Sequence, residues 1–209
     1  MSKITGLKRG RTRAKRVNVY LDGKFAISLT PETALKENLK VGQELGRKAL
    51  EALAEKDLRQ RSYNTAVRFL GYRPRSESEI RQRLTRHGFD EETVAKTLSR
   101  LRDEGLADDA AFASFWVENR ETFRPRSRRL AKLELKRKGL DTDIIEQAVG
   151  TIDDRENAYR AGLGRAGRLA ALDYREFRRR LGEYLARKGF NYSVIKEVTE
   201  KVWTESRNK

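Results

Sequence analysis

The chain offers few side chains for covalent or metal chemistry. It holds one histidine, His87, and no cysteine in 209 residues. A catalytic triad needs a histidine beside its nucleophile, and a zinc site needs several nitrogen or sulfur ligands. Two later repeats hold Lys138 and Lys188 at the place of His87, so we interpret His87 as a cation that complements a helix dipole. We expect no catalytic residue, no metal site and no cofactor.

Residues 162–167 read Gly-Leu-Gly-Arg-Ala-Gly and match the spacing of a dinucleotide-binding loop. That loop follows a β-strand and opens a helix, so that the pyrophosphate meets a helix N-terminus. Here the preceding residues 156–161 are polar and helical in pattern. We interpret 162–167 as a weak helix end or a loop between helices. A nucleotide-dependent enzyme stays a rival hypothesis, which calorimetry with ATP or NAD would test.

Two pairs of acidic residues could serve as a general acid and base. Asp108-Asp109 and Asp153-Asp154 each precede an apolar run of helical period. Aspartate is a favoured residue at the first position of a helix, where its carboxylate accepts hydrogen bonds from free backbone amides. We therefore predict that these pairs cap helices.

Clustered arginine and lysine side chains are the chemistry that this chain does offer. Lys and Arg number 47 against 31 Asp and Glu, which gives a formal net charge of +16. Such an excess attracts polyanions, and neutralising phosphates rewards clustered cations. Few aromatic residues lie near the clusters, so base stacking is not indicated. We expect contacts to a partner or to nucleic acid from Arg124, Arg128, Arg129, Lys132, Lys136, Arg175 and Arg179.

These cations lie in a segment that repeats with a period of about fifty residues. Residues 84–90 read Leu-Thr-Arg-His-Gly-Phe-Asp, and 135–141 and 185–191 hold close copies of that pattern. The tetrapeptide Arg-Pro-Arg-Ser also occurs twice, at 73–76 and at 124–127. Self-similarity at a fixed period is typical of an array of small units, and such an array presents a long surface.

Each unit is predicted to hold three helices. The second helix of a unit ends at a glycine, which adopts a left-handed conformation cheaply, and an Asp or Asn caps the third. We predict a mainly α fold of three tandem three-helix repeats, 61–107, 108–153 and 154–209, in an elongated array. It would contain nine helices between about 62 and 207.

Residues 1–60 are predicted to form a separate β-hairpin and α module. Apolar and polar residues alternate over 17–21 and 25–29, and Asp22-Gly23 between them is typical of a tight hairpin turn. Ile4 and Leu7 could belong to a third strand. Thr30-Pro31 predicts the start of a short helix that runs to about 38, and a helical stripe covers 45–60.

No apolar run approaches the roughly 18 residues that span a bilayer. The residues after Met1 lack the apolar centre of a secretion signal. Together with the absence of cysteine, these features predict a soluble cytoplasmic protein, which we expect to be a monomer.

The order and period of these motifs resemble the RecX family, which regulates the RecA recombinase. The resemblance rests on 73–80, on the segment Gly105-Leu106-Ala107-Asp108-Asp109-Ala110-Ala111-Phe112-Ala113, and on 179–190, and it covers about 60–205. The hairpin residues 21–25 look like the extension of longer members.

The resemblance implies a non-enzymatic regulator. RecX-like proteins are elongated arrays of three-helix bundles that lie in the groove of the RecA–DNA filament. There they modulate, and usually inhibit, strand exchange and co-protease activity in DNA repair and the SOS response. The alternative is a general nucleic-acid-binding protein that acts without RecA, because paired helices joined by a glycine turn can imitate a helix-turn-helix unit. The basic face could meet single- or double-stranded DNA, or acidic protein surface.

Overall fold

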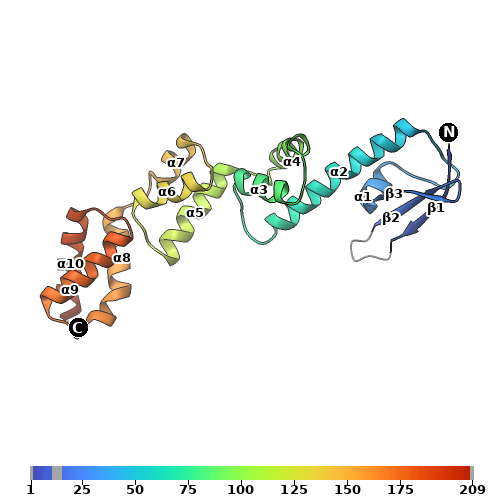
Figure 1. The fold of residues 1–209 in the computed structure, drawn as a ribbon. Coiled ribbons are helices and arrows are strands. Elements are labelled where there is room, and N and C mark those ends of the chain that lie inside the picture. Colours follow the sequence, from blue (N-terminus) through green and yellow to red (C-terminus); the bar gives the residue numbers. More distant parts are fainter. Residues whose placement is uncertain (1, 11–15, 208–209) are drawn as a thin grey trace. The chain divides into compact units, whose positions relative to one another are not determined.

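The computed structural model describes residues 2–10 and 16–207, which form a small sheet followed by helices (Figure 1). The chain divides into two compact units. One holds the residues up to 73 together with 80–107, and the other holds 74–79 together with those from 108 onward.

The N-terminal sheet is antiparallel, with strand order β3-β2-β1-β4. Its strands are β1 (Ser2–Arg9), β2 (Val17–Leu21), β3 (Lys24–Leu29) and β4 (Glu44–Leu45). Asp22 and Gly23 have φ angles of 47° and 80°, the left-handed backbone that a tight hairpin turn requires. The hairpin is confirmed, and the third strand suggested by Ile4 is β1. The two-residue strand β4 was not predicted.

A continuous helix connects the sheet to the first three-helix domain. After α1 (Pro31–Lys36), which Thr30 caps, α2 (Arg47–Leu70) runs for 24 residues. The predicted boundary at 60/61 falls inside α2, so the expectation of two separate helices was wrong. No glycine or proline interrupts 47–70, and nothing therefore breaks the helix. Leu53 packs in the core of the sheet, and Ala66 packs in the core of the first domain.

Three three-helix domains follow, as the repeat predicted. The first combines the C-terminal part of α2 with α3 (Glu77–Arg86) and α4 (Glu91–Asp103). The second comprises α5 (Asp109–Phe123), α6 (Arg128–Arg137) and α7 (Thr142–Val149). The third comprises α8 (Asp154–Ala166), α9 (Tyr174–Arg187) and α10 (Tyr192–Arg207). The mainly α fold class is confirmed for the part of the chain that the structure describes.

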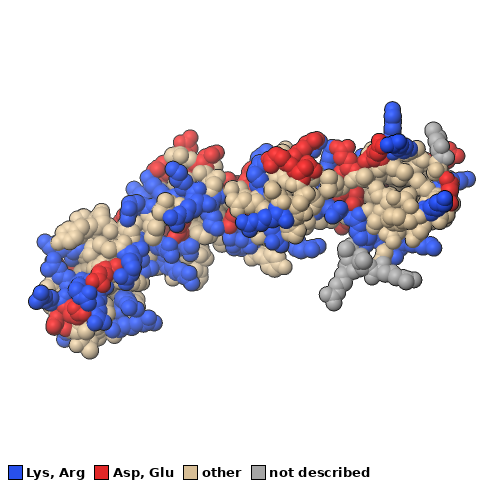
Figure 2. Space-filling view, in the orientation of Figure 1, with Lys and Arg blue, Asp and Glu red and all other residues tan. Residues whose placement is uncertain are grey.

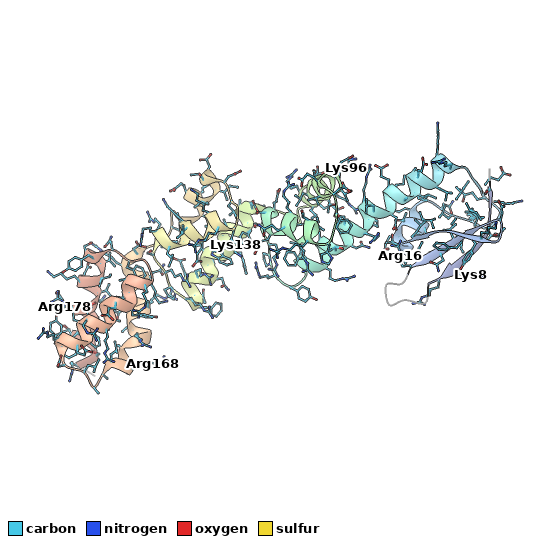
Figure 3. All side chains as sticks on the ribbon, viewed as in Figure 1. Lys8, Arg16, Lys96, Lys138, Arg168 and Arg178 are labelled. Atoms are coloured by element: carbon cyan, nitrogen blue, oxygen red, sulfur yellow. The ribbon has the colours of Figure 1, made fainter. Side chains whose placement is uncertain are left out.

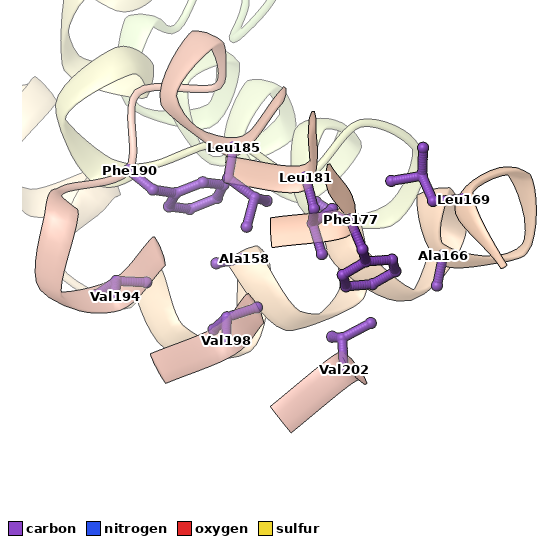
Figure 4. Packing of buried hydrophobic residues seen from close by; sticks show 11 residues of the cluster. Ala158, Ala166, Leu169, Phe177, Leu181, Leu185, Phe190, Val194, Val198 and Val202 are labelled. Carbon is purple, nitrogen blue, oxygen red and sulfur yellow. The ribbon is translucent and has the colours of Figure 1, made fainter. Parts of the chain in front are cut away.

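Each domain has its own thin core. In the third domain Phe177, Leu181 and Leu185 of α9 meet Val198 and Val202 of α10, and all five are buried (Figure 4). Each such side chain contributes about 1.5–3 kcal/mol when it leaves water. The second helix of each domain ends before a left-handed glycine, with φ of 82°, 79° and 89° at residues 88, 139 and 189. The glycine turn predicted from the repeat is therefore present in all three domains.

Residues 162–167 do not form a phosphate-binding loop. They continue α8 as far as Ala166 and then enter a short 3₁₀ turn, η1 (Gly167–Leu169). A Cβ at Gly162 would lie 3.2 Å from Val202 Cγ2, so this glycine allows α8 to pack closely on α10. A helix precedes the motif instead of the strand that a dinucleotide fold requires, and the nucleotide reading fails on that context.

Candidate partner and nucleic-acid interface

The acidic pairs cap two helices each. Asp108 Oδ1 accepts hydrogen bonds from the Ala110 and Ala111 amides at the start of its own helix, α5. Asp109 Oδ1 instead accepts from the Glu77 amide, 2.9 Å away at the start of α3. Burial raises the pKa of the Asp109 carboxyl, against the opposing effect of that hydrogen bond. The prediction of capping is confirmed, and the second aspartate of the pair caps a helix of the preceding repeat.

The same arrangement recurs one repeat later. Asp153 caps α8, and Asp154 Oδ1 accepts from the Arg128 amide at 2.6 Å. The capping serine of α6, Ser127, is fully buried, and its amide donates to the Lys188 carbonyl at 3.1 Å. In the earlier copy of the motif, Ser76 Oγ donates to the Lys138 carbonyl at 2.7 Å. Both Arg-Pro-Arg-Ser segments are therefore structural connections, each seated on the end of a helix in a later repeat.

Glu134 neutralises cations that point inward. Its carboxylate accepts from Arg120 Nε at 2.8 Å and from Trp116 Nε1 at 2.9 Å, and it also pairs with Arg126. Arg120 and Lys138 lie over the Trp116 ring, 4.4 and 4.9 Å from its centroid. The only acidic side chain between Arg124 and Leu140 is therefore already paired within the domain. The outer face of α6 keeps no acidic residue of its own.

Arg128 was expected on the binding surface, but the structure gives it an internal role. Its Nη2 donates to the Ile152 carbonyl at 2.6 Å and to the Gly150 carbonyl at 3.2 Å. These carbonyls follow α7, where a cation complements the free acceptors of a helix end. Arg128 therefore stabilises the second domain, and a partner would compete with these carbonyls for its guanidinium.

Lys132 is also engaged within the domain. Its Nζ lies 2.5 Å from Glu146 Oε2, and this ion pair bridges α6 and α7. Arg129 and Lys136 are exposed beside it on the same groove, whose lining also includes Leu133 and Ile145. Neither Arg129 nor Lys136 has an ion pair among the described residues. These two are the predicted α6 residues whose charge is available.

Of the two predicted cations on α9, only one is available. Arg179 lies 2.8 Å from Glu176 and 2.7 Å from Glu183. Hydrogen bonds from Arg179 and then Arg180 lower the pKa of Glu176 to about 2, so this carboxylate stays ionised and holds both guanidinium groups. Arg175 is exposed and has no acidic partner within the part of the chain that the structure describes. Of the two cations predicted on α9, Arg179 is therefore engaged within the helix and Arg175 is available.

Arg124 terminates α5 as its C-cap residue and is exposed. Further exposed cations of the second and third domains, outside the predicted contact set, include Arg137, Arg178, Arg187 and Lys196. Arg137 and Arg187 share one place in the repeat, two residues before the turn glycine, and that signal could have found them. Lysine and arginine side chains gather over the second and third domains in Figure 2, whereas acidic side chains gather over α4.

This arrangement of exposed cations can bind anions. Exposed cations meet a polyanion without first losing an internal partner, whereas a paired cation has to give one up. The available predicted residues are Arg124, Arg129, Lys136 and Arg175. Within the described residues, no group of three or more His, Asp or Glu could hold a metal ion, and no helix is both long and apolar enough to cross a membrane.

Four models of one protein family match successive parts of the chain. The N-terminal domain of regulatory protein RecX matches 2–46. The first, second and third three-helix domains of RecX match 63–101, 108–149 and 153–199. Together they cover most of the chain, in the order in which the sheet and the three helical domains occur.

Curated relatives and solved structures agree with these matches. Regulatory protein RecX of Amycolatopsis mediterranei is 40% identical over 144 residues, which are 66% of this chain and 82% of the relative. The protein of that name from Clostridium botulinum (strain Alaska E43 / Type E3) is 28% identical and covers 96% of both chains. A crystal structure of regulatory protein RecX superimposes with a TM-score of 0.71 at 27% identity, over 96% of this chain and all of the other.

Proposed function

This chain belongs to the RecX family of regulatory proteins, and we propose that it regulates the RecA recombinase by binding the RecA–DNA filament. In this proposal binding inhibits strand exchange and co-protease activity in DNA repair and the SOS response. The protein acts in the cytoplasm as a monomer, without a cofactor and without catalysis. Family membership supports a regulatory role, and the contact itself has to be argued from the residues.

The observation that carries the proposed contact is the separation of cations into two kinds. Arg128, Lys132 and Arg179 are held by carbonyls or carboxylates of their own domain. Arg129 and Lys136 project from α6 without an ion pair among the described residues, and the nearest acid on that helix, Glu134, is occupied by Arg120 and its neighbours. An unneutralised pair of cations on one helix face suits DNA phosphates or an acidic protein surface.

A charge reversal of the available pair tests this contact. In the variant with Arg129→Glu and Lys136→Glu, we expect half-suppression of the DNA-stimulated ATP hydrolysis of RecA to require about tenfold more protein, as the loss of two charge contacts would produce. The matched control is Lys24→Glu with Lys48→Glu, which makes the same change in net charge at exposed residues of the N-terminal module. Equal suppression by both variants would refute the assignment of the α6 face.

The formal net charge of +16 also favours the rival function, binding to nucleic acid without RecA. Such binding depends steeply on salt, because neutralised phosphates release counterions. A salt titration with naked single- and double-stranded DNA distinguishes the two. Strong, salt-dependent DNA binding together with no effect on RecA would favour the rival function over the regulator.

A further inference from the structure

A groove between α9 and α10 in the third domain combines an apolar floor with a cationic rim. It encloses about 700 Å³. Gly182, Ala186 and Ile195 line its length, and the Tyr192 ring beside them is 73% exposed. A large aromatic side chain left in water beside small and aliphatic residues marks a surface that is suited to a partner.

The second domain has the equivalent groove, but an ion pair bridges it. Gly139 and Gly189 are equivalent, so each position in α6 and α7 corresponds to the position fifty residues later. Lys132 and Glu146, which join α6 to α7, correspond to Gly182 and Lys196. A glycine and a lysine cannot form that pair. The second-domain groove encloses about 410 Å³ and the third-domain groove about 700 Å³.

The first domain is bridged in a similar way. Arg81 of α3 pairs with Glu91 of α4, and Arg81 occupies the repeat position of Lys132 and Gly182. Among the described residues no ion pair joins α9 to α10. The third domain therefore departs from the other two at the position where they place a bridging cation, and this departure leaves its groove open.

A buried hydroxyl at the groove has no hydrogen-bond partner. Thr199 lines the groove and is 1% exposed, and its Oγ1 makes no hydrogen bond to the described residues. The corresponding residue of the second domain is Val149, a side chain of the same shape without a polar group. A buried hydroxyl without a hydrogen-bond partner lowers the stability of the fold. Stability therefore does not explain why the third domain has threonine where the second domain has valine. A polar group of a bound molecule would satisfy it.

The rim of the groove determines the charge of its occupant. Arg175, Arg178 and Lys196 are exposed and have no ion pair within the described part of the chain (Arg178 is labelled in Figure 3). They complement carboxylates. A nucleic acid strand fits less well, because the apolar floor lacks phosphate ligands.

We propose that the α9–α10 groove binds an acidic amphipathic segment of a partner protein. An apolar side chain of the segment enters the floor between Tyr192 and Ile195, and its carboxylates meet Arg175, Arg178 and Lys196. This is the recognition mode in which a short amphipathic segment lays its apolar face into a groove. The inference stands apart from the proposed function, because its test contains no RecA and its expected ligand is a peptide.

A peptide selection tests the groove. Short random peptides displayed on phage are selected on the full chain, and the enriched peptides are synthesised and measured by fluorescence anisotropy. We expect them to combine Asp or Glu with Leu, Phe or Trp at helical spacing. Failure to enrich any peptide, or enrichment of peptides without acidic residues, would overturn the proposal. So would displacement of the peptides' signal by an oligothymidine that binds the groove more tightly than they do.

A closing variant shows whether the selected peptides use this groove. Gly182→Lys with Lys196→Glu installs the pair that bridges the second domain. A Cβ at Gly182 meets only Ile195 Cγ2, at 3.5 Å, and lysine is the better helix former, so the domain should stay folded. We expect the affinity for the peptides to fall at least about tenfold. The control Arg168→Gln makes the same net charge change on an exposed residue and should leave the affinity unchanged. Equal affinities for the closing variant and the wild type would refute the site.

The hydroxyl has its own test. Thr199→Val places the second-domain residue in the third domain. We expect this variant to melt at a higher temperature, because the unsatisfied group is gone, and to bind the selected peptides more weakly. A variant that gains stability with unchanged peptide affinity would show that the hydroxyl does not contact the occupant, and would overturn its part in the proposal.

Discussion

The connection between the second and third domains is predicted to depend on Gly189. Its φ is 89°, and a Cβ at this position would lie 2.5 Å from Ser127 Oγ and 3.0 Å from Leu130 Cβ. Ser127 is fully buried, and its amide is bonded to the Lys188 carbonyl. An alanine here cannot be accommodated without moving the serine that caps α6.

The cost of Gly189→Ala has two parts. A left-handed backbone costs an L residue about 1 kcal/mol. Displacing Ser127 weakens its hydrogen bond to Lys188 and its cap on the Leu130 amide, which together contribute about 2 kcal/mol. We expect a loss of about 3 kcal/mol, or about 13 °C in the melting temperature of this part of the chain.

The chain supplies a matched control in Gly88. Its φ is 82°, and a Cβ there would meet nothing within 4 Å. Gly88→Ala should therefore cost only the backbone part, about 1 kcal/mol. The difference between the two variants isolates the contact with Ser127.

The assay is hydrogen exchange of the full chain read peptide by peptide, since the two compact units need not unfold together. Gly189→Ala should speed exchange at the Ser127 and Leu130 amides, and adding Ser127→Gly should recover part of the lost stability, because the clash is relieved. Equal losses for the alanine variants at 88 and 189 would refute the reasoning, and so would additive effects in the double variant.

Three further predictions concern carboxylates. Asp57 is 4% exposed and accepts hydrogen bonds from the Thr30 amide and from Arg16. The substitution Asp57→Ala should therefore lower the free energy of unfolding of the N-terminal module by about 3 kcal/mol. An unchanged urea midpoint for that module would contradict this prediction. Glu134→Ala should destabilise the second domain by about 2 kcal/mol and change the Trp116 fluorescence, because three donors lose their half-buried acceptor. A Glu118→Ala control should do neither. The pKa of Glu176 is lowered from 4.5 to about 2, so the stability that this carboxylate contributes is complete above pH 4.5 and is lost as the pH falls toward 2. When the melting temperature is measured at a series of acidic pH values, the Glu176→Gln variant should lack this part of the pH dependence. A variant profile identical to that of the wild type would contradict the prediction.

The helical domains could be predicted because local signals and the repeat agree with the tertiary structure. The turn glycines, the capping serines and aspartates, and the apolar stripes of α9 and α10 are short-range features, and each domain confirms the others. The continuity of α2 was missed because the apolar stripe was followed only as far as residue 60, where the N-terminal module was taken to end. The sequence contains no breaker there, and the absence of glycine and proline was the more reliable sign.

The sequence could not show which cations are engaged inside a domain, for a physical reason. Helical-face arithmetic shows which cations share a side of a helix, but it does not show which acceptors lie opposite. Arg128 meets carbonyls more than twenty residues away, and Lys132 meets Glu146 on the next helix. Both contacts depend on how α6 packs on its neighbours. Sequence proximity therefore groups the cations of α6, but it does not separate those that hold the domain together from those that are available.

The repeat itself supplies the missing criterion once the structure aligns its positions. A residue that fulfils one structural role in every copy, as the turn glycine does, is explained by the fold. A position at which one copy abandons a stabilising contact made by the others is not explained in this way. Gly182 forgoes a bridge that Lys132 makes, and Thr199 buries a hydroxyl where Val149 has none. Both positions line the same groove, so a bound partner accounts for the two together.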